Sequence, residues 1–159
     1  MNLLMIAYVH VYSKLPKDLQ RVVDEYVCPN TDYYREKIIE KLKIHPDLGD
    51  DGFKTTKSTY VNQKSFLCKN SITNIIECMN KIPLCYKKLK NKYKICSYGG
   101  KHVMEQELKN YVSNGEFIMS MLLLNWEYKL LSDSLDCIYI GRKLTEREKK
   151  TSKVFEFIL

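Results

Sequence analysis

The chain has 159 residues, which suits one domain or one domain with a small appendage. Hydrophobic residues make up 45% and charged residues 28%, a globular composition that excludes a wholly disordered chain, and six glycines and four prolines exclude a collagen-like one. The 26 basic and 19 acidic residues give a net charge of +7, which favours an anionic partner.

The first part of the chain predicts helices. Residues 3–12 are apolar but too short to span a bilayer, which takes about 20 residues, and they lack the features of a signal peptide. Apolar side chains recur at three- and four-residue steps in residues 15–27 and again in 32–44, so we expect a helix in each. His45 and Pro46 should end the second.

A linker is expected next. Residues 46–53 combine proline, glycine and aspartate, and residues 54–70 are polar and weakly patterned. We therefore divide the chain into an N-terminal helical segment (1–45), a linker or irregular region (46–70) and a C-terminal helical module with a β-hairpin (71–159).

The C-terminal module should open with two helices. Ser71 can cap a helix that carries Ile72, Ile75 and Ile76. Pro83 separates it from a second helix, residues 84–94, in which tyrosines and leucines share one side and lysines spread over the rest.

The basic charge is concentrated in this region. No acidic residue stands between Cys78 and Met104, and without the seven lysines of this stretch the chain would be neutral. Such a segment can bind phosphate, an anionic lipid surface or an acidic protein face. It can also be no more than a solvated helix face.

A polar cluster follows a predicted turn at Gly99–Gly100. On a helix of residues 101–111, Lys101 and His102 lie one turn before Glu105 and can both pair with it. One interpretation is an anion or nucleotide contact beside the turn. The other is a helix start held by an ion pair and a satisfied histidine.

The segment from Ser113 predicts the central helix of the core. Ser113 and Glu116 have the spacing of a capping box, and the run from Phe117 to Leu124 is nearly continuous in apolar residues. Gly115 indicates either a close backbone approach or an unusual dihedral angle. The alternative for Asn114–Gly115 is a hairpin turn.

The C-terminus should combine strands with a helix. Residues 128–131 and 137–140 can form two short strands, and Thr145 with Glu148 makes a second capping box that opens a helix to about residue 158. The fold class expected is mainly α (α+β): a small helical domain with a short β-hairpin near the C-terminus.

The six cysteines show no paired spacing, so we expect reduced thiols in a cytosolic or nuclear compartment, and not a secreted protein. No motif indicates a cofactor, a metal site or a catalytic residue, and we expect a protein that is not an enzyme.

Two resemblances suggest an origin. The pattern S-Y-x-x-K-H-x-x-E followed by Y-x-S-N-G-x-F-I, which begins at Ser97, resembles a module in uncharacterised small proteins of large DNA viruses and some tailed phages. The resemblance covers residues 93–140, with departures at Asn125–Trp126 and at residues 136–139. The leucine-proline start at Leu15 resembles F-box-like helices. The resemblance to viral proteins implies that the chain lies in the host cytoplasm or nucleus, or in a virion.

These observations lead to one expected function and one alternative. We expect a non-enzymatic viral interaction module whose lysine-rich face engages an anionic partner, with nucleic acid first. The alternative is a minor virion structural protein that contacts other viral proteins. The residues expected to bind nucleic acid are Lys87, Lys88, Lys90, Lys92, Lys94, Tyr98, Lys101 and His102.

Overall fold

The computed structural model describes residues 31–57, 61–146 and 148–149, and the side chains of residues 91–94 lie outside this description. The helix expected at residues 15–27, with the F-box-like start, lies outside the described residues, as do residues 150–158 of the expected C-terminal helix. The capping box expected at the start of that helix is confirmed: Thr145 N–H donates to Glu148 Oε2 at 3.0 Å, and Glu148 N–H donates to Thr145 Oγ1 at 3.3 Å. The helices are α3 (Thr31–Ile44), α4 (Lys69–Cys85), α5 (Ser97–Leu108) and α6 (Asn114–Leu123), with a short 3-10 helix, η1 (Lys64–Leu67). The strands are β1 (Leu48–Gly49), β2 (Gly52–Phe53), β3 (Tyr86–Cys96), β4 (Tyr128–Leu130) and β5 (Cys137–Lys143).

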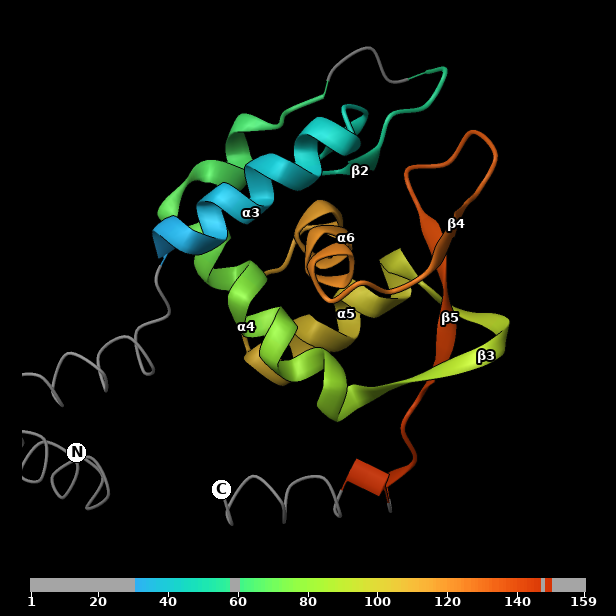
Figure 1. Cartoon of the computed structure of the whole chain (residues 1–159). Helices are drawn as coiled ribbons and strands as arrows, with labels where there is room; N and C mark the ends of the chain where they lie inside the picture. The colour runs from blue at the N-terminus through green and yellow to red at the C-terminus, as the bar shows by residue number, and fades with distance from the viewer. Residues whose placement is uncertain (1–30, 58–60, 147, 150–159) are drawn as a thin grey trace, which may run out of the picture.

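Helix α6 lies at the centre of the domain, as the apolar run predicts. Every residue from Asn114 to Leu122 is buried, and α3, α4 and α5 surround the helix (Figure 1). Ser113 caps it: its hydroxyl accepts the Glu116 N–H at 3.0 Å, and Glu116 accepts the Ser113 N–H at 2.9 Å. The predicted capping box is therefore confirmed and the hairpin turn at Asn114–Gly115 is wrong.

The mainly helical fold with a C-terminal hairpin is confirmed. Strands β4 and β5 pair antiparallel, with Tyr128 opposite Tyr139 and Leu130 opposite Cys137. Strand β3 adds to the other edge of β5, which gives a three-stranded sheet of order β3-β5-β4. In Figure 1 this sheet lies on the right of the domain, while α3 and α4 lie on its left.

The predicted second helix, residues 84–94, is wrong. Helix α4 runs through Pro83 to Cys85, and the chain then becomes strand β3. Leucine, tyrosine and isoleucine alternate with lysine from Leu89 to Ile95, except at Asn91, and this two-residue period is typical of a strand. Pairing with β5 stabilises the extended conformation, which the three- and four-residue spacing did not reveal.

Three other boundaries differ from the predictions. Residues 46–53, expected as a linker, contain the β1–β2 ribbon, in which Leu48 and Phe53 are buried as part of the hydrophobic core. Phe53 N–H also donates to Leu135 O at 2.9 Å. Helix α4 begins at Lys69, so Ser71 lies inside it and is not its cap. Gly99 and Gly100 belong to the first turn of α5, not to a turn before it.

Candidate functional site

The sheet is the most basic element of the described chain. Its three strands carry eight basic residues and no acidic residue. The basic residues are Lys87, Lys88, Lys90, Lys92 and Lys94 on β3, Lys129 on β4, and Arg142 and Lys143 on β5. We call these strands the basic sheet. The sequence singled out only the lysines of β3, because only strand pairing brings in residues from positions 129 to 143.

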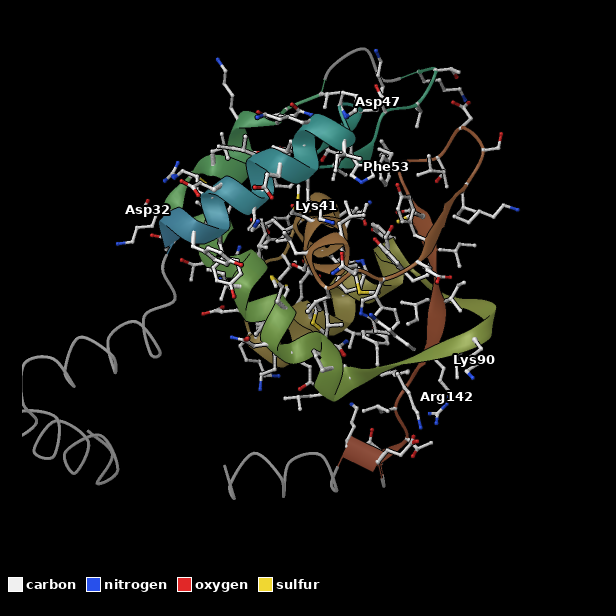
Figure 2. The ribbon with its side chains drawn as sticks, in the orientation of Figure 1. Asp32, Lys41, Asp47, Phe53, Lys90 and Arg142 are labelled. Carbon is white, nitrogen blue, oxygen red and sulfur yellow. The ribbon has the colours of Figure 1, made fainter. Side chains whose placement is uncertain are left out.

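The register places β3 lysines against the basic end of β5. Lys87 lies opposite Arg142, and Tyr86 opposite Lys143. After Lys88, which faces Gly141, the register shifts so that Tyr93 faces Ile140, and residues 89–92 therefore bulge from the ladder. Figure 2 shows Lys90 and Arg142 at this outer end of the sheet. Lys87 and Lys90 are exposed.

Two basic side chains of the sheet already have internal partners. Lys88 Nζ donates to the carbonyl oxygens of Leu124 and Asn125 at 3.1 and 3.2 Å, at the end of α6, and lies over the Trp126 ring. Arg142 makes a two-pronged pair with Glu148 at 2.6 and 2.8 Å, which holds the pKa of that carboxyl well below its usual range. Among the described lysine side chains of β3, Lys87 and Lys90 are therefore better placed than Lys88 to contact phosphates.

The expected Lys101–His102–Glu105 cluster is present on α5. Lys101 Nζ lies 3.2 Å from Glu105 Oε1, and His102 Nδ1 lies 2.7 Å from Glu105 Oε2. Burial alone would raise the pKa of the Glu105 carboxyl, but hydrogen bonds from His102, Lys101 and Val112 outweigh it and lower this pKa. Glu105 also accepts the Val112 N–H, so the cluster ties α5 to the segment before α6.

The residues expected to bind nucleic acid therefore separate into two groups. Lys101 is buried in its ion pair, whereas His102 is exposed and Tyr98 is 55% exposed, with their rings in edge contact. These three lie on α5, beyond the end of β3, and not on the lysine strand itself.

Among the described residues no group of three or more histidine, cysteine or acidic side chains could hold a metal ion.

The described cysteines fall into two classes of reactivity. Burial raises the pKa of Cys78 and of Cys137 to about 12, whereas Cys68 and Cys96 are exposed. The thiolate is the nucleophile, so at about pH 7.5 iodoacetamide should alkylate the exposed pair long before the buried pair. Peptide mass mapping over time checks this, with urea-unfolded protein as the control in which all thiols react.

The mass of the intact protein tests the redox state of the cysteines. All five described cysteines have free thiols, and Cys28 lies outside the described residues. We expect the intact native protein to have the mass of six reduced thiols. A mass lower by the two hydrogens of a disulfide would contradict this expectation. Equal labelling rates for Cys68 and Cys78 would instead contradict the predicted difference in reactivity.

Comparison of this chain with family models, with curated proteins and with solved structures gives no match. The resemblances to the viral module and to F-box-like helices therefore stay predictions. No helix among the described residues has the length and apolar character needed to cross a membrane.

Proposed function

We propose that the chain is a non-enzymatic interaction module of a large DNA virus and that its basic sheet engages nucleic acid. The observation that carries this proposal is the charge of the sheet: eight basic residues and no acidic residue over three paired strands. Electrostatic attraction to phosphates supplies most of the non-specific binding to nucleic acids.

The bulge of β3 supports the same proposal. It holds Lys90 at the outer end of the sheet, while Lys87 stands opposite Arg142 (Figure 2). A ribbon that projects cations from one end can follow a phosphate backbone, because successive phosphates then meet successive side chains. A single-stranded nucleic acid also needs rings on which its bases stack, and Tyr98 lies two residues after the end of β3.

The test is the double variant Lys87→Gln/Lys90→Gln. It leaves Lys88 in place, because Lys88 binds the end of α6. We expect the variant to keep its fold and to bind a single-stranded oligonucleotide about tenfold more weakly. The slope of log affinity against log salt should fall by about 0.7 for each lysine that contacts a phosphate. Fluorescence anisotropy at several salt concentrations measures both quantities.

The matched control is Lys43→Gln/Lys69→Gln. It removes the same number of exposed lysines, but from α3 and from the first residue of α4, and none from the sheet. Its affinity and salt slope should stay close to those of the wild type. If the two variants lost the same amount of affinity, the loss would be due to the lower net charge of the protein and not to the position of the lysines on the sheet. Wild-type binding that does not depend on salt would instead favour the alternative, a virion protein that packs against other proteins.

A further inference from the structure

A pocket of about 390 Å³ lies where the basic sheet meets α5 and α6. This volume is within the range of about 300–1,000 Å³ typical of small-molecule sites. The pocket begins where the strands end: Tyr98 is two residues after the last residue of β3, and Asp136 directly precedes β5. Chain segments far apart in sequence, from Asp51 to Asp136, meet around it.

The rim of the pocket is apolar and exposed. Tyr98, Tyr111 and Leu135 are 55%, 68% and 38% exposed. They are three of the six large exposed hydrophobic residues of the described chain, gathered around one hollow. Exposed aromatic residues around a pocket favour a ligand with a flat ring, which can stack on them.

The floor of the pocket is polar and buried. Lys101 Nζ lies 5.5 Å from the centre of the Tyr98 ring and 5.1 Å from that of Tyr111. Asn114 also lines the pocket and is buried, with only 6% of the residue exposed. The floor therefore offers a cationic donor and an amide at the base of two aromatic rings.

The Asn114 amide has one unused acceptor. Its Nδ2 donates to Asp51 O and Asp136 Oδ1, both at 3.0 Å, and these acceptors fix which end of the amide is nitrogen. Its Oδ1 is buried and accepts no hydrogen bond from any described residue. A buried acceptor without a donor is costly, and a donor-bearing ligand would satisfy it. The oxygen is covered in this structure, so a ligand can satisfy it only if the pocket wall moves.

The charge of the lining excludes a phosphate as the group that enters. Asp51 and Asp136 contribute carboxylates, and the only cation of the lining, Lys101, is already paired with Glu105. A further anion would be repelled by these carboxylates. A group with N–H donors and no negative charge fits both the carboxylates and the unpartnered acceptor of Asn114.

We propose that this pocket takes one base of a single-stranded nucleic acid, with a preference for bases that carry an amino group, while the flanking phosphates lie on the basic sheet. This inference rests on the proposed function. A guanidinium group would suit the same donors and rings. However, a basic peptide would be repelled by the sheet that starts at the pocket, whereas a nucleic acid would be attracted to it.

The experiment compares labelled oligonucleotides of about 12 nucleotides: oligo-dA, oligo-dC, oligo-dT and an abasic chain with the same number of phosphates. We expect the wild type to bind oligo-dA and oligo-dC about tenfold more tightly than the abasic chain, with oligo-dT between them. Tyr98→Leu and Tyr111→Leu should each reduce this difference and leave the affinity for the abasic chain unchanged. Two variants are used so that the test survives if one fails to fold.

The matched control is Tyr33→Leu, which replaces a tyrosine of similar exposure on α3, outside the pocket. It should keep the full preference for base-bearing chains. Equal binding of base-bearing and abasic chains would overturn the inference, but it would not contradict the proposal that the basic sheet binds nucleic acid. Failure to bind any of the four chains would overturn the proposed function as well. Displacement of oligo-dC by argininamide, but not by lysinamide at equal ionic strength, would overturn the inference in favour of a guanidinium-bearing partner.

Discussion

Phe117→Ala is expected to destabilise the protein by about 3–5 kcal/mol, because it empties a site at the centre of the core. The Phe117 side chain is fully buried on α6 and meets the rings of Tyr86 and Tyr139 edge to face. Gly100 of α5 lies against the same ring, so closely that a Cβ there would overlap it. Loss of the ring therefore removes contacts between α6, α5 and the sheet together. Urea unfolding measures the loss.

Ser113→Ala is the companion variant, on the same segment but at the surface of the core. It removes one hydroxyl of the capping box and should cost about 1 kcal/mol. Neither variant should alter the affinity for an oligonucleotide under conditions in which it is folded. If both variants kept wild-type stability and lost oligonucleotide binding, Ser113 and Phe117 themselves would be contact residues, and their interpretation as purely structural residues would be wrong.

Local signals predicted the elements that depend on neighbouring residues. The helix at residues 32–44 and the capping box at Ser113 and Glu116 both follow from spacing within a few residues, and both are present. The C-terminal hairpin was likewise readable, since two β-rich runs flank Ser132–Ser134. In each case the hydrogen-bond partners are close in the sequence, so the local sequence pattern is enough to predict the element.

Strand β3 was missed because its conformation depends on a distant partner. Its lysines fit a helix with a basic face as well as a strand, and β5, which decides between them, begins 41 residues after Cys96, the last residue of β3. The two-residue alternation from Leu89 was the available signal. The same reason explains the missed cations: Arg142 and Lys143 join the site only through the register with Lys87 and Tyr86.

The pocket could be predicted only in part. Tyr98 and Lys101 were singled out as binding residues, but the motif gave no sign that Asn114 would meet Asp51, 63 residues away, and Asp136, 22 residues away. Asn114 was considered only as part of a helix start or a turn. In the structure it is both the first residue of α6 and a wall of the pocket, so one segment stabilises the core and shapes the candidate site.

Gly115→Ala is expected to destabilise the protein by about 2 kcal/mol or more, although alanine is the better helix former. A Cβ at Gly115 would overlap the Gly49 carbonyl oxygen and lie 2.8 Å from the Asp50 Cα. Both are backbone atoms, so no change of side-chain rotamer can relieve the overlap. The ribbon of β1 and β2 would have to move away and lose the Gly115 N–H to Asp50 O hydrogen bond of 2.7 Å. The sequence left close approach and an unusual dihedral open. Close approach is the reason, since Gly52 alone among the described glycines has a positive φ.

Gly99→Ala is the matched control, because it makes the same substitution in a helix with the opposite surroundings. Gly99 is exposed on α5, and a Cβ there would meet no atom within 4 Å. Alanine should therefore stabilise the protein by about 0.5–1 kcal/mol, through the lower entropy of the unfolded chain and its higher helix propensity. Urea unfolding of both variants should shift the midpoint in opposite directions. A stabilised Gly115→Ala variant would show that α6 does not pack against the β1–β2 ribbon in solution, and the Asp51 wall of the pocket would be lost with that contact.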